Sequence, residues 1–376
     1  MSKTLYRIQT ALLFLSVLSV GSPPLAEELM IQGYYGDYDA EQKISGFPSK
    51  SLTGPKTEKW TVPVPTKAYH IGVLFPHLKD PYWESANYGI ISHARWLNLK
   101  ITLYTAGAYS NFGNQRMQLM QLATRKKVDG ILLASVDYNK MDPFVEEVSN
   151  LGIPIVALIN DIHAPKIKSK IMVSFFEMGY KLGQYVLQNS HQKELKIALL
   201  PGPQKSGWAA DTVKGFFEAI SDFRAPRQKI TLLKPLYGDT RKDVQRMRLD
   251  ILNRSENHGL DFIVANAVAA VEAVSYLAEN REIHPTSQIV STYITSKVYE
   301  ELERGNILAA LSDQSISQCQ IALDMVAKIL DGNVPGKDFP FRVSPLIPLI
   351  TRENIGQYEY EKLFGEKGFT PVFSEF

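Results

Sequence analysis

The sequence has a single cysteine, almost no excess of charge and only one long apolar run. One thiol, Cys319, can form no internal disulfide and cannot build a zinc cluster, so stability has to come from core burial, which a chain of 376 residues allows. Apolar residues at helical spacing predict a helix over 315–330. Cys319 lies on its apolar stripe, so we interpret it as a buried thiol without a catalytic role.

An excess of charge of one sign is also missing. The 41 Lys and Arg outnumber the 39 Asp and Glu by two, and this excess lies in the first 26 residues, where Lys3 and Arg7 stand without any acid. A mature chain with no net charge exerts no general attraction on nucleic acid or on an anionic membrane. We therefore expect no nucleic-acid partner.

The motifs of nucleotide, metal and hydrolase chemistry are absent as well. The loop after the first predicted strand has no Gly-x-Gly-x-x-Gly, and the chain has no Gly-Lys-Ser/Thr, no Gly-x-Ser-x-Gly and no His-Glu-x-x-His. No residues in the sequence pair a nucleophile with a base. We therefore predict a protein that is not an enzyme and needs neither cofactor nor metal.

The one long apolar run lies at the N-terminus. Lys3 and Arg7 precede the apolar stretch 11–20, which is the pattern of a secretory signal peptide and is shorter than the roughly 20 residues of a membrane span. We predict a signal peptide over 1–26, cleaved after Ala26; an uncleaved N-terminal anchor is the alternative. After cleavage we expect no direct membrane insertion.

From Tyr69 onward, apolar runs of strand length alternate with amphipathic helical patterns. This alternation is typical of βαβ units and predicts an α/β fold with parallel sheets buried on both faces. This alternation runs to residue 159 and a second series of strands begins at residue 196, which predicts two similar doubly wound lobes. Ligands bind beyond the carboxyl ends of such strands, so the cleft between the lobes is the expected site.

Large aromatic residues stand at the places in the sequence that such a cleft would use. Tyr82 and Trp83 open the first helix, Tyr109 follows the second strand, Phe175 lies at the lobe junction and Tyr293 ends a strand of the second lobe. Any one of them alone is more often a core residue. Their shared location favours a group of rings around an apolar or alkylammonium group, because aromatic faces are negative.

Three polar positions near these rings have two interpretations each. Asp80, followed by proline, is best interpreted as a helix N-cap. Asp313 and Gln314 follow a strand of the second lobe, where they can cap the next helix or bond a polar ligand atom, and we include both in the candidate site. The pair at 160–161 can serve a turn or a polar contact.

Several stretches spread over residues 69–372 carry a resemblance to a known family. They are Leu78-Lys79-Asp80-x-Tyr82-Trp83-x-x-x-Asn87-Tyr88-Gly89, Ala106-Gly107-x-Tyr109-Ser110, Asp161-x-x-Ala164-Pro165-x-x-Lys168-Ser169, Met178-Gly179-Tyr180, Pro201-Gly202-Pro203, Val213-x-Gly215-Phe216, Ser312-Asp313-Gln314 and Gly368-Phe369-x-Pro371-Val372. In these stretches the chain resembles the type I periplasmic binding proteins of the ribose-binding class. Within that class it is most similar to the TorT family, the periplasmic sensor partners of the trimethylamine N-oxide respiratory system.

The resemblance implies a periplasmic protein that closes its two lobes, as a Venus flytrap does, on a small molecule such as a methylated amine or trimethylamine N-oxide. It also implies docking on the periplasmic domain of a membrane sensor histidine kinase, in two-component signalling. The aromatic positions Tyr82, Trp83, Tyr109 and Tyr293 match the family, whereas Phe175 stands where the family carries tryptophan. A larger ring face holds a methylated cation better, so Phe175→Trp is expected to raise affinity for trimethylamine N-oxide.

The expected organisation follows from this fold class. Residues 27–67, with many Gly and Pro, form an extended leader that straps a lobe or contacts the partner. The N-terminal lobe is placed at 68–172 and 313–334, and the C-terminal lobe at 173–312 and 335–376. Three crossings are expected, near 172–174, 291–293 and 311–313.

A second function remains open at this point. A substrate-binding protein that delivers a sugar or an autoinducer-like solute to a transporter would have the same fold. Sugar sites are lined mainly by charged and amide side chains that bond hydroxyl groups, whereas aromatic residues dominate the candidate site here. This difference favours the methylated ligand.

Overall fold

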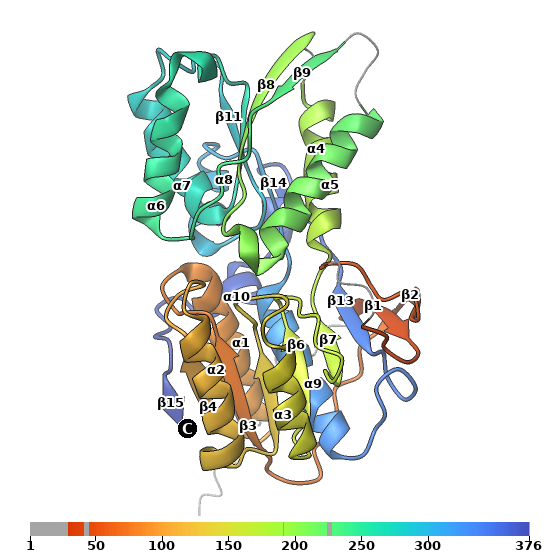
Figure 1. Ribbon diagram of the computed structural model, residues 1–376. Helices are drawn as coiled ribbons and strands as arrows, with labels where there is room; N and C mark the ends of the chain where they lie inside the picture. Colours follow the sequence, from red (N-terminus) through yellow and green to blue (C-terminus); the bar gives the residue numbers. More distant parts are fainter. Residues whose placement is uncertain (1–28, 41–44, 191, 224–227, 376) are drawn as a thin grey trace, which may run out of the picture.

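The protein consists of two α/β lobes, stacked one above the other in Figure 1. The computed structural model describes residues 29–40, 45–190, 192–223 and 228–375, so the predicted signal peptide lies outside the described residues. Each lobe holds one mainly parallel sheet with helices on both faces, which confirms the predicted fold class. Within the described residues, no helix is both long and apolar enough to span a membrane.

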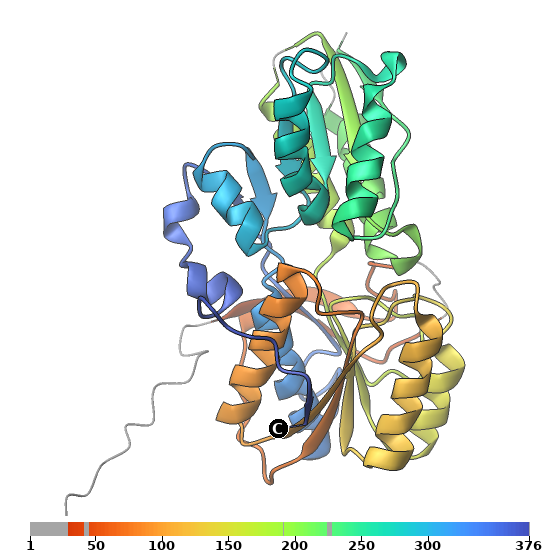
Figure 2. The ribbon, with the colours of Figure 1, turned by 90° about the vertical axis from the view of Figure 1, so that its left-hand side faces the viewer.

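The N-terminal lobe, at the bottom of Figure 1, is built on a nine-stranded sheet in the order β15-β4-β3-β5-β6-β7-β13-β1-β2. The strands are β1 (Met30–Tyr35), β2 (Thr53–Lys59), β3 (His70–Phe75), β4 (Lys100–Thr105), β5 (Gly130–Leu133), β6 (Ile155–Leu158), β7 (Ser169–Ile171), β13 (Arg342–Pro345) and β15 (Ser374–Glu375). Its helices are α1 (Pro81–Trp96), α2 (Phe112–Gln121), α3 (Asp142–Asn150), α9 (Ser315–Leu330) and the short α10 (Tyr360–Phe364). Helices α1 and α9 cover one face of the sheet, and α2 and α3 cover the other (Figure 2). The central strands are continuous apolar runs because both of their faces are covered.

The C-terminal lobe has a six-stranded sheet in the order β14-β12-β11-β10-β8-β9, in which only β14 is antiparallel. Its strands are β8 (Glu194–Leu200), β9 (Lys229–Leu232), β10 (Phe262–Ala265), β11 (Gln288–Ser291), β12 (Ala309–Leu311) and β14 (Leu349–Thr351). Its helices are α4 (Phe175–Gln188), α5 (Trp208–Phe223), α6 (Lys242–Asp250), α7 (Ala267–Glu279) and α8 (Ser296–Glu303). A π turn extends α2 at Leu122–Lys126, and short 3-10 turns lie at Gln204–Ser206, Ile251–Asn253, Ser255–Asn257 and Ile355–Gln357.

The chain passes between the two sheets four times rather than three. The passages lie at 172–174, at 312–314, at 346–348 and again between β14 and β15. The first two lie where the sequence predicted them. The passage predicted near 291–293 is wrong, because the chain returns from β11 through α8 to β12, which pairs with β11 in the same sheet.

The end of the chain also differs from the prediction. We placed 335–376 in the C-terminal lobe, but only β14 joins that sheet. β13 lies between β7 and β1, and β15 pairs with β4, so both belong to the N-terminal lobe. The order of elements in the sequence could not show this, because β13 and β15 pair with strands that precede them by more than 150 residues.

The leader is a built part of the N-terminal lobe rather than chain lying over its surface. β1 and β2 form an antiparallel pair, and β1 continues the sheet beside β13. Trp60 directly follows β2, and its indole N–H donates to Asp324 Oδ2 of α9 at 2.8 Å. The ring of His93 of α1 forms a hydrogen bond with the other oxygen of this carboxylate at 2.7 Å. The leader is therefore anchored to both the sheet and the helices of this lobe.

The single cysteine lies where the sequence placed it. Cys319 is fully buried on α9, and burial raises the pKa of its thiol. It faces Gly89 of α1 so closely that a Cβ atom on that glycine would lie 3.0 Å from the Cβ of Cys319. The thiol thus belongs to the packing between α1 and α9.

Candidate ligand-binding site

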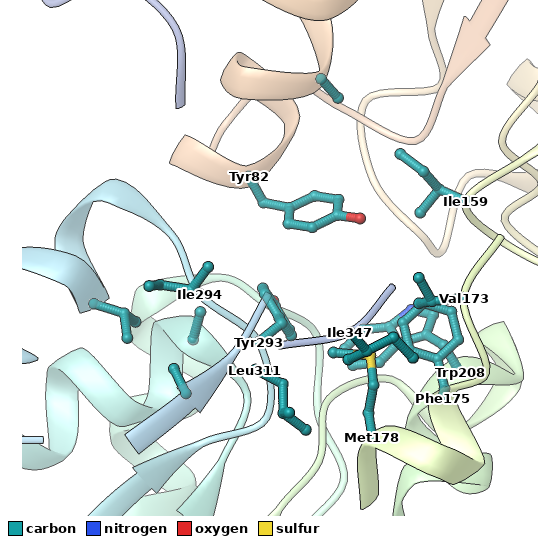
Figure 3. Packing of buried hydrophobic residues seen from close by; sticks show 14 of the residues in the cluster. Tyr82, Ile159, Val173, Phe175, Met178, Trp208, Tyr293, Ile294, Leu311 and Ile347 are labelled. Atoms are coloured by element: carbon teal, nitrogen blue, oxygen red, sulfur yellow. The ribbon is translucent and has the colours of Figure 1, made fainter. Parts of the chain in front are cut away.

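Aromatic side chains from both lobes surround one cavity between the lobes. The N-terminal lobe supplies Tyr82 and Trp83 from the first turn of α1 and Tyr109 from the loop after β4, and the C-terminal lobe supplies Phe175 and Tyr293. Figure 3 shows Tyr82 reaching across to the rings of the other lobe. The Tyr82 and Tyr293 rings meet edge to face, with centroids 5.2 Å apart. All five aromatic residues singled out in the sequence therefore line one space, which we call the aromatic box.

A sixth ring in the aromatic box, Trp208, was missed in the sequence. It is the first residue of α5, and its ring centroid lies 6.1 Å from that of Phe175 and 5.9 Å from that of Tyr293. The signal was present, because an aromatic residue opens a helix after a strand and a loop, as at Tyr82. Its indole N–H is buried and makes no well-aligned hydrogen bond among the described residues, although the Tyr109 hydroxyl lies beside it.

The presence of Trp208 changes the effect expected for the substitution Phe175→Trp. Phe175 is only 7 % exposed and packs directly against Trp208. The box therefore already holds an indole next to the position where the family resemblance implied a tryptophan. The gain in affinity expected for Phe175→Trp no longer follows, because a second indole would compete with Trp208 for the same space.

Two buried carboxyl groups complete the wall. Asp80 is the predicted N-cap of α1, with Oδ1 accepting the Trp83 N–H at 3.2 Å, but it also lines the box. Asp313 does not cap α9 with its side chain; instead it accepts the Tyr82 hydroxyl at 2.5 Å. Removal from water raises the pKa of Asp80 to about 7 and that of Asp313 to about 6. Both groups can therefore change charge near neutral pH.

Three further residues close the box. Asn160 donates to the Ser135 carbonyl at 2.9 Å and lies 3.4 Å from the Tyr109 hydroxyl, while Thr240 comes from the loop before α6. Ile159 has a φ of 63°, a left-handed conformation that costs a β-branched residue energy. We interpret this strain as the cost of holding the chain at the wall of the box.

Two polar residues considered in the sequence lie outside the box. The Gln314 amide donates to the Leu346 carbonyl at 2.7 Å, so it ties two of the passages between the lobes together. Asp161 is bound to the Lys170 ammonium at 2.8 Å in a separate buried cluster. Of the seven candidate site residues, six line the box and Gln314 does not.

The box is nearly filled by its own side chains. Only about 20 Å³ inside it is open to the centre of a water molecule, room for one or two waters. On the side of α6 and α7 it continues into an outer cleft where about 350 Å³ is open in the same sense, and Asp80, Tyr82, Thr240 and Tyr293 line both spaces. A ligand larger than water therefore has to part the side chains that fill the box, and the outer cleft is the adjoining open space.

Comparison with known proteins gives the family. Residues 71–333 match the model of the periplasmic binding protein domain. The curated periplasmic protein TorT of Escherichia coli (strain K12) is 32% identical over 308 residues, which is 82% of this chain and 85% of that protein.

Two solved structures are informative neighbours. The complex of the TorS sensor domain with TorT in the presence of TMAO contains a chain that is 28% identical with a TM-score of 0.69, and the match covers 81% of this chain and 100% of that one. An ABC transporter solute-binding protein from Bradyrhizobium sp. BTAi1 with bound Bis-Tris is 27% identical with a TM-score of 0.74. That match covers 93% of this chain and 99% of the other.

Proposed function

The chain belongs to the periplasmic binding protein family, with the periplasmic location that this membership implies, and we propose that it captures a small methylated amine or amine oxide between its lobes and so regulates a membrane sensor histidine kinase. In this proposal the protein binds its ligand without transforming it. The bound molecule is trimethylamine N-oxide or a close relative, and the ligand-binding residues are the six aromatic side chains of the box with Asp80 and Asp313.

One observation carries the ligand class: rings from both lobes and two buried carboxyl groups surround a single small space. Aromatic faces attract a methylated nitrogen cation, with up to about 2 kcal/mol per desolvated contact. A hydroxyl-rich sugar would instead leave many of its hydrogen bonds unmade among these rings, at a cost of about 1–3 kcal/mol each. The box is therefore suited to an onium head.

The N–H of Trp208, which has no well-aligned acceptor among the described residues, supports an amine oxide in particular. Trimethylamine N-oxide carries a methylated, positively charged nitrogen and a negatively charged oxygen. The rings can surround the methyl groups while the oxygen accepts the indole hydrogen bond and, where Asp80 is protonated, a second one. A bond of this kind would give the buried indole donor a well-aligned, charged acceptor in place of its weak contact with the Tyr109 hydroxyl.

Calorimetry on the purified protein in phosphate buffer tests the ligand class. The probes are trimethylamine N-oxide, tetramethylammonium, Bis-Tris and D-fucose. We expect the first two to bind and D-fucose not to bind. Binding of the sugar alone would contradict the proposal.

The kinase partner is proposed from the relatives, because the TorT chain to which this one is similar forms a complex with the TorS sensor domain. Titration with the periplasmic domain of the sensor kinase encoded nearest to this protein, with and without trimethylamine N-oxide, measures the coupling. If ligand changes partner affinity, the partner must change ligand affinity by the same factor. Absence of any complex in both conditions would remove the sensor role and leave the ligand class standing.

Delivery of a solute to a transporter is the alternative function. It is favoured by the match to the Bradyrhizobium solute-binding protein, which covers more of this chain than the TorT matches do. The Bis-Tris bound to that protein is an amine rich in hydroxyl groups, so it does not by itself favour a methylated ligand over a hydroxyl-rich one. Binding to a permease rather than to a sensor domain decides between them.

A further inference from the structure

The leader does more than extend the sheet of the N-terminal lobe, because its residues 45–47 also touch the C-terminal lobe. We call this segment the clasp. On the N-terminal side, the Gly46 N–H donates to Asp161 Oδ2 at 2.9 Å and the Gly46 carbonyl accepts from the Arg342 guanidinium at 2.8 Å. Both partners are at least 96 % buried, so the clasp is held firmly by this lobe.

On the other side, the clasp binds two helices of the C-terminal lobe. The Ser45 hydroxyl donates to Asp211 Oδ2 of α5 at 2.6 Å. The Phe47 ring packs against Phe176 of α4 with centroids 5.0 Å apart, and the Lys214 ammonium lies 5.3 Å from the same ring. A segment anchored in one lobe therefore bonds the other lobe directly.

The two helices that the clasp touches are packed backbone against backbone. A Cβ atom on Gly179 of α4 would lie 1.9 Å from the Thr212 carbonyl oxygen of α5, and one on Gly215 would lie 1.9 Å from the Phe176 carbonyl oxygen. Such backbone contact leaves no room for the helices to slide. These helices also begin with Phe175 and Trp208, two rings of the aromatic box.

We propose that the clasp restrains the hinge and positions the α4–α5 wall of the aromatic box through the hydrogen bond from Ser45 to Asp211. The box has to open for a ligand to enter, and opening moves α5 away from the N-terminal lobe. Since the clasp stays with the N-terminal lobe, each opening breaks its bonds to Asp211 and Phe176. The leader thus sets how often the empty protein opens.

The first test needs no ligand and so does not depend on the proposed function. Leu151→Cys and Met247→Cys place one spin label on each lobe at exposed positions, and Cys319→Ala removes the buried native thiol. In this background, at pH 8.5, Ser45→Ala is expected to raise the ratio of open to closed protein about tenfold, seen as a longer and broader distance distribution. Burial raises the pKa of Asp211 to about 7, so its carboxylate is charged at this pH, and a hydrogen bond to a charged group is worth about that factor. Ser51→Ala is the matched control, because that hydroxyl donates to Asp37 within the leader.

Variants of Asp211 separate positioning from general destabilisation. Asp211→Ala should open the lobes as Ser45→Ala does, and the double variant should open them no further, because both remove one bond. Asp211→Asn keeps an acceptor for Ser45 and should restore the closed distance. An unchanged distance in Ser45→Ala, or additive effects in the double variant, would overturn the proposal.

Ligand kinetics give the second test, which rests on the proposed function. In stopped-flow fluorescence with trimethylamine N-oxide, both the association and dissociation rates of Ser45→Ala should rise about tenfold relative to Ser51→Ala. If no amine binds to the unsubstituted protein, the proposed ligand is wrong while the distance measurement still decides on the clasp. If the ligand rates are unchanged while the distance between the spin labels changes, the clasp affects the distance between the lobes but not ligand entry, contrary to our proposal.

Discussion

Replacing Trp208 by phenylalanine should weaken the binding of an amine oxide much more than the binding of a quaternary ammonium ion. The substitution keeps an aromatic ring against Phe175 and Tyr293, whose ring centroids lie 6.1 Å and 5.9 Å from that of Trp208. It removes the indole N–H, which is buried and has no well-aligned acceptor among the described residues. Tetramethylammonium cannot use this donor, whereas trimethylamine N-oxide offers it an oxygen with negative charge.

The magnitude follows from two contributions. A hydrogen bond to a charged acceptor contributes about 1.5–3 kcal/mol, so its loss should weaken amine oxide binding by about 10- to 150-fold. Phenylalanine also has a weaker π face than tryptophan, and this difference of about 0.5–1 kcal/mol applies to both ligands. Tetramethylammonium should therefore lose only about two- to fivefold.

Calorimetry with both ligands on the unsubstituted protein and on Trp208→Phe measures the difference. Trp96→Phe is the matched control, because Trp96 stacks on His93 of α1 and does not line the box. Thermal unfolding shows whether the fold is kept. An equal loss for the two ligands would refute the hydrogen-bonding role of Trp208, and no loss for either would place the ligand elsewhere.

Three other predictions concern charge, packing and the thiol. In calorimetry, the binding of tetramethylammonium should tighten as the pH rises from 5.5 to 8 and then level off. Burial raises the pKa of Asp313 to about 6 and that of Asp80 to about 7, and a cation binds more tightly beside ionised carboxylates. An affinity that does not change with pH would contradict the role of these two groups. Gly179→Ala should lower the melting temperature by several degrees, because the added Cβ would overlap the backbone of α5. The control Gly113→Ala should raise the melting temperature slightly, because Gly113 lies on the exposed face of α2 with no neighbour within 4 Å. Equal shifts in the two variants would contradict the close packing of α4 on α5. Cys319 should react with a thiol reagent only at the rate of unfolding, and rapid labelling of the folded protein would show that α1 and α9 are packed less closely than described.

The buried part of the fold could be predicted from the sequence because it repeats a simple pattern. α9 has the predicted bounds, because its apolar stripe is clear, and β3, β5 and β10 are strands of the predicted kind, because central parallel strands are continuous apolar runs. β2 could not be found in this way. It is an edge strand of the sequence Thr-Gly-Pro-Lys-Thr-Glu-Lys whose residues are almost all exposed, so no apolar pattern distinguishes it from a loop.

Most of the candidate site could be predicted because its residues occupy strand ends and helix starts, which the fold brings together. Trp208 obeys the same rule, because it opens α5 after β8 and a loop. Gln314 was expected to cap the next helix or bond a polar ligand atom, but its backbone is left-handed, with φ of 53°, and its amide donates to the Leu346 carbonyl instead. The crossing near 291–293 was wrong because the same turn residues follow a strand whether the chain then returns to the same sheet or passes to the other lobe.

The position of β13 between β7 and β1 has a consequence for the order in which the chain can fold. Ile31 of β1 pairs with Pro345 of β13, so the leader hairpin has no sheet to join until more than 300 later residues have been added. The C-terminal lobe needs little from outside 175–311, whereas the N-terminal lobe also needs α9, β13 and β15 from the end of the chain. Contacts between distant residues form slowly, because the loop they close costs entropy before the contact is gained. The lobe whose first strands emerge earliest is therefore the one completed last, and a chain truncated before residue 342 should leave β1 and β2 unpaired with the sheet.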